Sequence, residues 1–529
     1  MKNRTVLRGG AVVGGQGVVR ADVAIEGETL TAVGHVDARP DDEVVDVSHR
    51  LVLPGFIDAH SHADGLLSDP DVALTLLRQG VTTVIAGQDG VSYAPGDGEY
   101  ASEYFAAING RLPTYRGGGV DAYLSCVDGT SALNAGYLVP AGTVRFEVCG
   151  RTDGPATEDE RRRMQGLVAQ GLADGALGLS TGLDYTPGIF QDAAEIAALC
   201  VPVARVGGVY VTHMRGGYEA NSAAGITEIV EIARLAATEA DAMLAVHISH
   251  LHADADIVLE QLARLAAAGV DATFDAYPYT RGCTLLGMPL LPADVSALPA
   301  SEAVAVIADP ARRAELRERC TLRAVTSASL GPDWADMITL AHLAAPELAW
   351  AHGLTVREAA ERADVAPIDF ALDALAASRL ECSAVMAVRS PRSGAELARI
   401  FAHPAHMGGS DGIFLGAHPH PRAAGSFSLF LREYVRDRQV WSWADAVGHL
   451  STLPARRFGL GRRGVVETGA VADLVVVDPA TVGDTATYAD PGSRGVGIDD
   501  VFVGGIRVLA DGERTDALPG RGLRRSPKI

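Results

Sequence analysis

Two histidines follow a short apolar segment near the start of the chain, in the sequence Leu51-Val-Leu-Pro-Gly-Phe-Ile-Asp-Ala-His60-Ser-His62. The apolar run is typical of a core strand. Because residues i and i+2 of a strand point to the same side, His60 and His62 project together. Two converging imidazoles can hold a divalent metal ion, and a pair of hydrogen-bonded core histidines is the alternative.

Three later segments have the same form, an apolar strand that ends in a side chain able to bind a metal. They end at His213, at His250 and, within 406–412, at Asp411. Side chains gathered from the carboxyl ends of several parallel strands are typical of the active site of a (β/α)8 barrel. Four segments of this form in one chain predict a metal-dependent hydrolase.

Asp89 ends another predicted strand, 81–88, immediately before Gly90. Its carboxylate would bind a metal, bridging two ions through its two oxygens, or else it forms an Asx turn before the glycine. The chain contains only two lysines, Lys2 and Lys528, and neither lies in a predicted barrel strand. A metal pair bridged by a carbamylated strand lysine is therefore excluded.

These residues define a hydrolytic mechanism. His213, His250 and Asp89 would hold one metal ion and leave a fourth position for water. The metal would lower the pKa of that water towards about 7 and polarise a carbonyl group. Asp411 would take the water proton and deliver it to a departing amine, unless it is only a turn aspartate. The histidines of the first segment would hold a second metal or orient the substrate.

The composition sets the class of protein. The chain has 529 residues, 48% of them hydrophobic, with a net charge of −21 and a pI near 5.1. This acidity argues against nucleic acid and anionic membranes as partners. Six cysteines occur without a CxxC pair, which favours reduced thiols in a cytosolic protein. We find neither an apolar signal-peptide block nor a bilayer-spanning run, so a cytoplasmic location is expected. The sequence specifies no oligomeric state.

Strand-like and helix-like segments alternate along the middle of the chain, as the βα units of an α/β fold require. Helical patterns cover 158–173, 192–206 and 224–239. The fold class that follows is a (β/α)8 TIM-like barrel. Its expected strands are 52–60, 81–88, 121–127, 175–181, 208–214, 243–250, 271–277 and 405–411.

Both ends of the chain are rich in short strands and Gly/Asp turns. We expect residues 1–52 and 456–529 to form one composite β-sandwich, with the barrel occupying 53–455. The interval after 284 is too long for one βα connection, so residues 284–350 are predicted to form a helical insertion near the barrel mouth. Such a subdomain would act as a lid or serve only as structural packing.

Nine segments together resemble the D-aminoacylase (N-acyl-D-amino-acid deacylase) branch of the amidohydrolase superfamily, over nearly the whole chain. They are PGFIDAHSHAD at 54–64, GVTTVIAGQDGVS at 80–92, GALGLSTGLDYTPG at 175–188, YVTHMRG at 210–216, ISHLH at 248–252, DAYPYT at 275–280, GGSDG at 408–412, HPRAAGSF at 420–427 and ADLVVVDP at 472–479.

The resemblance implies a zinc enzyme that cleaves small N-acyl-D-amino acids to a carboxylate and a D-amino acid. It implies His213 and His250 as ligands of a tighter metal, the HxH pair at a second position, and Asp411 as the base. Arg422 of the HPR motif would grip the substrate carboxylate through its bidentate fork. Two tyrosines of the matching motifs would line the pocket or fill the barrel with bonded hydroxyls, namely Tyr185 and Tyr279.

Two departures from the family pattern bear on chemistry. The family usually has cysteine where this chain has Asp89, and an oxygen ligand would move the metal preference from zinc towards manganese, iron or cobalt. The family's substrate-binding lysine is His252 here, which leaves that residue as a substrate contact or a plain surface or supporting residue. These departures keep open a related hydrolase for another amide, a cyclic amide or a dipeptide. A non-catalytic scaffold is the third possibility.

Overall fold

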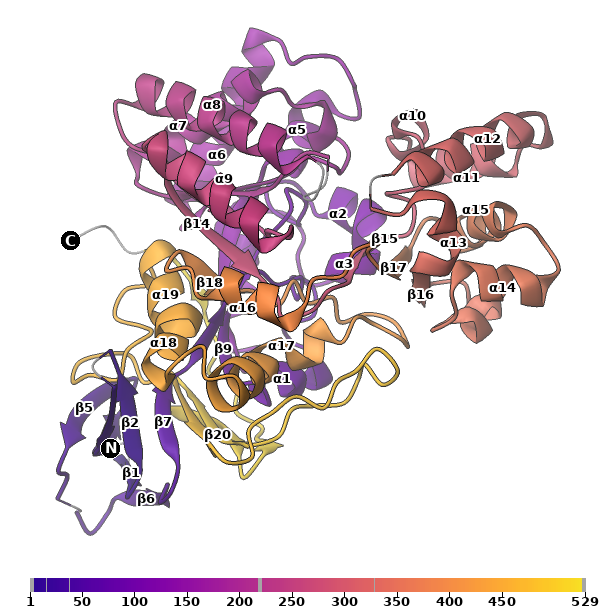
Figure 1. Cartoon of the computed structure of the whole chain (residues 1–529). Helices are drawn as coiled ribbons and strands as arrows, with labels where there is room; N and C mark the ends of the chain where they lie inside the picture. Colours follow the sequence, from indigo (N-terminus) through magenta and orange to yellow (C-terminus); the bar gives the residue numbers. More distant parts are fainter. Residues whose placement is uncertain (1–3, 16, 38, 217–220, 328, 526–529) are drawn as a thin grey trace.

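The structure, a computed structural model, describes residues 4–15, 17–37, 39–216, 221–327 and 329–525, and Lys2 and Lys528 lie outside them (Figure 1). Within these residues, eight parallel strands lie side by side in chain order. They are β8 (Phe56–Asp58), β9 (Val81–Ala86), β10 (Asn134–Pro140), β11 (Gly178–Gly182), β12 (Val209–His213), β13 (Ala245–Ile248), β14 (Asp271–Ala276) and β18 (His406–Gly408).

The two ends of this sheet meet and close the barrel. The Ala59 amide donates to the Gly408 carbonyl at 3.1 Å, and Ser61 forms a parallel bridge with Gly412. Beyond the strands, the Asp411 amide donates to the His60 carbonyl at 2.8 Å. The predicted TIM-like barrel is therefore confirmed, and its closure brings the first and last strand ends together.

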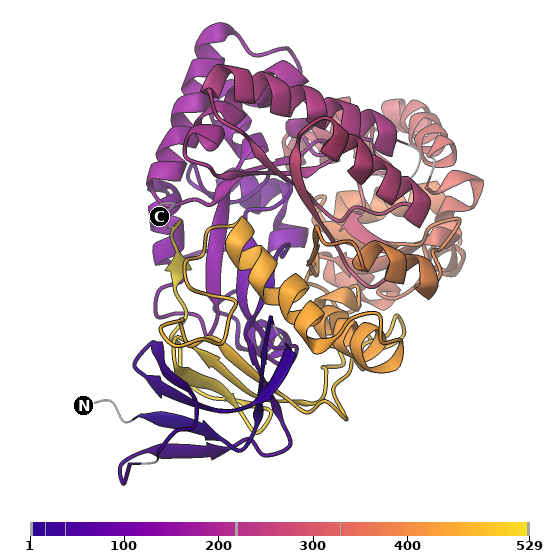
Figure 2. The ribbon, with the colours of Figure 1, turned by 60° about the vertical axis from the view of Figure 1, so that its left-hand side comes forward.

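Helices cover the outside of the barrel between successive strands (Figures 1 and 2). Among those expected, the segment 158–173 is helical over its full length and begins with a capping box in which Thr157 and Glu160 satisfy each other's backbone amides. The barrel helices are α1 (Pro70–Leu77), α2 (Glu99–Tyr104), α3 (Ala106–Asn109), α4 (Gly119–Ser125), α5 (Ala141–Cys149), α6 (Glu158–Ala173), α7 (Ala193–Arg205), α8 (Ser222–Ala240), α9 (Ala255–Ala267), α16 (Gly394–Phe401), α17 (Arg422–Leu429), α18 (Trp443–Val447) and α19 (Leu453–Arg457).

One expected strand was wrong. Residues 121–127 belong mostly to α4, and the third barrel strand is β10 instead. The buried side chains Val120, Tyr123, Leu124 and Val127 recur at the i, i+3, i+4, i+7 spacing of a helix. β10 contains a glycine and ends in a proline, and these residues weaken a strand pattern.

Strands from both termini form two sheets that pack on a shared apolar cluster, which includes Leu7, Val52, Leu474 and Phe502 (Figure 2). One sheet contains β1 (Thr5–Arg8), β4 (Asp22–Glu26), β5 (Thr29–Gly34) and β6 (Glu43–Asp46). The other contains β2 (Ala11–Gly14), β3 (Gly17–Arg20), β7 (Leu51–Pro54), β19 (Leu474–Val477), β20 (Ile498–Val503), β21 (Ile506–Ala510) and β22 (Glu513–Arg514). β7 pairs with β19, so the two termini meet directly before the chain enters the barrel. At the C-terminal end, β23 (Gly522–Leu523) pairs with β10 of the barrel.

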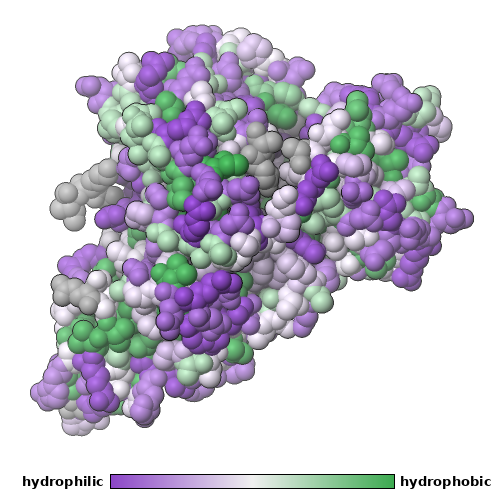
Figure 3. All heavy atoms as spheres, in the orientation of Figure 1, coloured by the Kyte–Doolittle hydropathy of each residue, from purple (hydrophilic) through white to green (hydrophobic). Residues whose placement is uncertain are grey.

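A separate lobe interrupts the barrel between β14 and α16 and projects from its side (Figures 1 and 3). Its own apolar core runs from Leu286 to Ala384, beyond the expected end at 350, because the last strand returns to pair with the first two. The lobe contains β15 (Gly282–Leu285), β16 (Ile338–Leu343), β17 (Cys382–Met386), α10 (Ala293–Ser296), α11 (Ala300–Ala308), α12 (Pro310–Thr326), α13 (Trp334–Met337), α14 (Val356–Ala363) and α15 (Pro367–Ala377).

Among the described residues, no helix combines the length and the hydropathy that a transmembrane span needs.

A buried carboxylate secures the seam between β8 and β18. Asp58 is fully buried, and its Oδ1 accepts from the Ser410 amide at 2.7 Å and from the His60 amide at 3.2 Å. The Ser410 hydroxyl donates to the other carboxylate oxygen of Asp58 and accepts from the Gly412 amide at 3.0 Å. Asp58 and Ser410 therefore fix the backbone on both sides of the seam.

We predict that Ser410→Ala lowers stability by about 1–3 kcal/mol, because it leaves a buried Asp58 oxygen without its donor. Ser249→Ala is the matched control, since the Ser249 hydroxyl is buried and has no hydrogen-bond partner among the described residues. Thermal unfolding monitored by circular dichroism should show a lower midpoint for the first variant only. Equal midpoints for both would contradict this role of the seam.

Candidate metal centre

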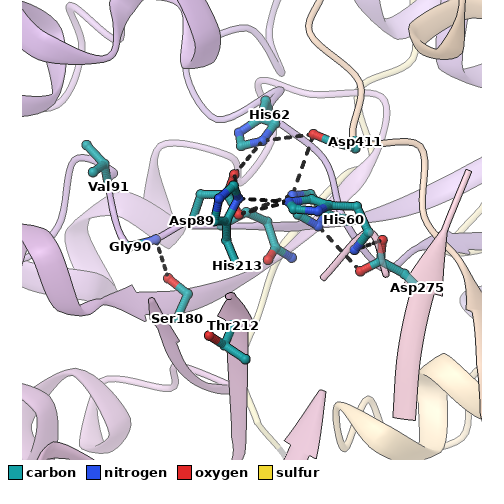
Figure 4. Close-up of polar contacts among 12 residues, drawn as sticks. His60, His62, Asp89, Gly90, Val91, Ser180, Thr212, His213, Asp275 and Asp411 are labelled. Carbon is teal, nitrogen blue, oxygen red and sulfur yellow. Dashed lines mark hydrogen bonds and ion pairs between the residues drawn. The ribbon is translucent and has the colours of Figure 1, made fainter. Parts of the chain in front are cut away.

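The side chains predicted to bind metal converge at the carboxyl ends of the barrel strands (Figure 4). His60 and His62 follow β8, and Asp411 follows β18 across the seam. Asp411 Oδ1 lies 3.3 Å from His62 Nε2 and 3.7 Å from His60 Nε2. All three side chains are buried. Closure of the barrel therefore places His60 and His62 against Asp411, although about 350 residues separate them in the sequence.

Asp89 lies in the turn after β9, with its carboxylate among the imidazoles. Its φ of 54° is left-handed, as a turn residue requires, and Gly90 follows with a φ of 69°. Its carboxylate lies 3.7 Å from His60 Nε2, from His62 Nε2 and from His213 Nδ1, and 3.8 Å from His250 Nε2. Asp89 therefore lies in a turn with its carboxylate directed at the four imidazoles.

The other two histidines complete the cluster from the opposite side of the barrel. His213 ends β12 and His250 follows β13, and His213 Nδ1 lies 3.0 Å from His250 Nε2. His213 Nε2 lies 3.1 Å from Asp184 Oδ2. His250, like Asp89 and Asp411, has positive φ, at 33° compared with 54° and 50°. Such strained backbone is concentrated at functional sites, where the surrounding structure enforces it.

The donor set fits a divalent metal. Two groups of three residues have ligand atoms within 4.8 Å of one another, His60–His62–Asp411 and His60–Asp89–His250. His60 Nε2 and Asp89 Oδ1 are buried without a hydrogen-bond partner among the described residues. Ligand nitrogens of a tetrahedral zinc site lie about 3.3 Å apart, given bonds of roughly 2.05 Å. A cation among these atoms would satisfy lone pairs that the protein leaves open.

A supporting hydrogen bond turns the free ring nitrogen of His62 towards the cluster. Asn109 Nδ2 donates to the Val91 carbonyl at 2.9 Å, which directs the Asn109 oxygen to His62 Nδ1, also at 2.9 Å. Because an amide oxygen only accepts, His62 Nδ1 carries the proton and its Nε2 offers a lone pair. Such partners set the tautomer of a metal-binding histidine.

Asp275 supports two of the histidines at once. It is fully buried at the end of β14, and its Oδ2 accepts from His60 Nδ1 at 3.4 Å (Figure 4). The same oxygen accepts from His247 Nε2 at 3.0 Å. Its Oδ1 accepts from the His250 amide at 2.9 Å. Asp275 therefore orients the His60 ring and holds the strained backbone of His250.

The charges of the cluster balance one another in the absence of metal. Burial lowers the pKa of His60, but Asp275, Asp411 and Asp89 outweigh it and raise that pKa to about 9. Burial likewise opposes protonation of His213, yet Asp184 and Asp89 raise its pKa to about 10. Burial raises the pKa of Asp89, and His213, His250 and His60 bring it well below its usual value. Metal binding would replace these protons, because metal ligands bind as neutral imidazoles.

A cavity of about 180 Å³ opens directly above the cluster. Tyr185, His252 and Arg422 line it, whereas Tyr279 does not occur among its described lining residues. Tyr279 packs instead against His420 and Tyr488, with ring centroids 5.4 and 6.2 Å away. The Tyr185 hydroxyl lies 2.8 Å from Thr284 Oγ1 of β15. The inserted lobe therefore supplies part of the cavity wall.

Arg422 lies at the base of this cavity and is fully buried. Its Nη1 lies 2.9 Å from Asp411 Oδ2, its Nη2 donates to the Cys283 carbonyl at 3.2 Å, and its guanidinium lies 4.5 Å from the ring centre of Tyr277. Burial raises the pKa of Asp411, but Arg422 and His60 outweigh it and lower that pKa. Asp411 is therefore ionised and can accept a proton.

Sequence reasoning missed four residues that contact the site, namely Asn109, Asp184, Tyr277 and Asp275. Asp275 and Tyr277 stand in the DAYPYT motif and Asp184 in the GLDYTPG motif, so the motifs themselves were the available signal. Asn109 lies in α3, in a stretch without a motif. Its role depends on a contact with His62, 47 residues away, which no local pattern reveals.

The chain matches the model of the amidohydrolase family over residues 43–508. It is 32% identical to an N-acyl-D-glutamate deacylase of Alcaligenes xylosoxydans xylosoxydans, in an alignment that covers 99% of this chain and 97% of that protein. These matches extend over the barrel and both terminal sheets.

Two solved structures have the same fold over their whole length. One is an N-acyl-D-glutamate deacylase of Bordetella bronchiseptica in complex with zinc and a phosphonate inhibitor, with a TM-score of 0.79, 30% identity, and coverage of 99% of this chain and 100% of that chain. The other is a D-aminoacylase with a binuclear metal centre, with a TM-score of 0.79, 30% identity, and coverage of 98% and 99%.

We predict that Asp275→Asn weakens metal binding about 10–100-fold, because the carboxylate that orients His60 and clamps His250 is lost. Chelator competition with elemental analysis measures this affinity. Asp271→Asn, at the other end of β14, is the matched control and should bind metal as the wild type does. Equal affinities of the wild type and Asp275→Asn would refute the supporting role of Asp275.

Proposed function

Because the chain belongs to the D-aminoacylase (N-acyl-D-amino-acid deacylase) family of amidohydrolases, we propose that it hydrolyses the amide bond of N-acyl-D-amino acids to a carboxylate and a D-amino acid. The observation that carries this proposal is the convergence of His60, His62, Asp89, His250 and Asp411 beneath one cavity. A metal-dependent amidohydrolase needs such a cluster within its substrate-binding cavity.

The proposed cofactor is one or two divalent metal ions held by His60, His62, Asp89, His213, His250 and Asp411. Zinc is the first candidate, since it accompanies the similar deacylase of Bordetella bronchiseptica. Manganese, iron and cobalt are the alternatives, because Asp89 offers oxygen ligands. Bound there, the metal would lower the pKa of a water molecule and polarise the substrate carbonyl.

Asp411 is proposed as the general base and acid. Its carboxylate is ionised beside Arg422 and faces the histidine pair, so it can take one proton from the attacking water. The oxygen of that water joins the carbonyl carbon, and the carbon–nitrogen bond breaks. The proton held by Asp411 passes to the amine nitrogen as it departs, which returns Asp411 to its ionised form. The second proton of the water stays on the new carboxyl group and then passes to the freed amine, which leaves the products as a carboxylate and a D-amino acid with a protonated amine.

The cavity wall is proposed to orient the substrate. Arg422, which lines the cavity, would bind the α-carboxylate, and its stacking on Tyr277 fixes the guanidinium plane. Tyr185 would pack against the substrate, since its hydroxyl is already bound to Thr284. His252 is proposed as a substrate contact in the neutral form: its Nδ1 donates to the His250 carbonyl, and its buried Nε2 has no hydrogen-bond partner among the described residues.

We predict that Asp411→Asn lowers kcat for N-acetyl-D-amino acids by about 10²–10⁴-fold through loss of the base. A spectrophotometric amine assay over a panel of N-acetyl-D- and N-acetyl-L-amino acids, dipeptides and cyclic amides measures this effect. The metal content of the variant is the control that separates lost proton transfer from lost metal. Turnover of the dipeptides or cyclic amides alone by the wild type would overturn the proposed substrate class.

A further inference from the structure

We propose that a second cavity, between the barrel and the inserted lobe, binds the acyl chain of the substrate. The preferred substrates are then N-acyl-D-amino acids with an unbranched aliphatic acyl group longer than acetyl. This inference rests on the proposed function and specifies the acyl group. The lobe cavity adjoins the cavity above the cluster, because Asp184 and Met288 line both.

The walls of the lobe cavity are mainly apolar, and they come from two separate cores. Leu285 belongs to the apolar core of the barrel, whereas Leu291 and Leu375 belong to the core of the inserted lobe. Ile189 and Leu298 add further aliphatic surface. The cavity therefore lies where the two cores meet, and a chain of methylene groups that entered it would leave water for apolar surroundings.

The charged side chains that line the lobe cavity already have partners within the protein. Arg151 Nη2 pairs with Glu103 Oε2 at 2.5 Å, and Glu103 Oε1 accepts from the Ala300 amide at 2.8 Å. Arg323 Nη2 donates to the Met288 carbonyl at 3.1 Å. Because these charges are balanced or hydrogen-bonded without a ligand, the cavity favours an uncharged, apolar occupant over a charged one.

The arrangement of the cluster decides which part of the substrate reaches the lobe cavity. Arg422, the proposed partner of the α-carboxylate, lies 2.9 Å from Asp411 on one side of the cluster. Asp184, where the two cavities adjoin, lies 3.1 Å from His213 Nε2 on the other side. In a trans amide the α-carbon and the acyl chain lie on opposite sides of the carbon–nitrogen bond. A substrate with its carboxylate at Arg422 and its carbonyl over the cluster therefore directs its acyl chain towards Asp184.

The test compares N-hexanoyl-D-alanine with N-acetyl-D-alanine. Each buried methylene group strengthens binding about fourfold, so we expect the wild type to favour the hexanoyl derivative by at least about tenfold in kcat/KM. Ala293→Phe places a ring in the wall of the lobe cavity and should reduce this ratio about tenfold, mainly through the hexanoyl derivative. Ala305→Phe is the matched control, since Ala305 is exposed on α11 and does not occur among the described residues that line either cavity.

A second variant guards against misfolding of the first. Leu298→Asn replaces an apolar wall residue by a polar one of similar size and should lower the same ratio. Far-UV circular dichroism and metal content show whether each variant is folded. If N-acyl-D-amino acids are hydrolysed but the wild type has no preference for hexanoyl, or both variants keep its ratio, the acyl site is refuted and the proposed function stands.

The amino-acid side chain is the other group that could occupy the lobe cavity. If the two variants lower the preference for N-acetyl-D-norleucine over N-acetyl-D-alanine and leave the hexanoyl preference unchanged, the cavity holds that side chain and the acyl assignment is overturned.

The hexanoyl preference can also be measured without turnover, as equilibrium binding of the two D-alanine derivatives to Asp411→Asn and to Ala293→Phe/Asp411→Asn. If no N-acyl-D-amino acid is hydrolysed, the proposed function fails. The binding ratio then still decides the role of the lobe cavity: a ratio that falls in the double variant supports it, and an unchanged ratio or the absence of binding overturns it.

Discussion

Four imidazoles and two carboxylates are buried together at the mouth of the barrel, where bulk water cannot satisfy their charges and lone pairs. Protons shared between the rings and the carboxylates balance the cluster, and this is why the pKa values of His60 and His213 rise to about 9 and about 10. A divalent cation can replace those protons and satisfy His60 Nε2 and Asp89 Oδ1, which have no hydrogen-bond partner among the described residues. The barrel, its seam and its supporting hydrogen bonds all serve to keep this cluster assembled.

The chain divides positioning and recognition between different parts of the fold. Strand ends and the seam between β8 and β18 hold the cluster, with Asp58, Asp275 and Asn109 as buried supports. The cavity wall comes from loops and from the first strand of the inserted lobe, which has its own apolar core. Because the lobe packs separately, its residues can change the shape and charge of the cavity with little effect on the cluster beneath.

The residues of the cluster could be predicted from the sequence, because each follows an apolar strand and this pattern is visible within a short segment. The barrel followed from the alternation of strands and helices, although 121–127 was assigned to a strand when its buried residues have helical spacing. Contacts between distant segments were beyond the reach of such patterns. Asn109, Asp184 and Asp275 act through partners 25 to 215 residues away. Tyr277 rather than Tyr279 occurs among the described residues that line the cavity, because the chain bends between them.

A substitution of Asp89 tests the proposed metal-dependent deacylase most directly, because the Asp89 carboxylate approaches all four histidines. The measurement is elemental analysis of purified wild type and Asp89→Ala, alongside hydrolysis of N-acetyl-D- and N-acetyl-L-amino acids. We expect the wild type to contain bound metal and to hydrolyse N-acetyl-D-amino acids, and we expect Asp89→Ala to lose both the metal and the activity. Metal retained in Asp89→Ala, with neither series hydrolysed by the wild type, would make Asp89 a turn residue and contradict the proposed deacylase.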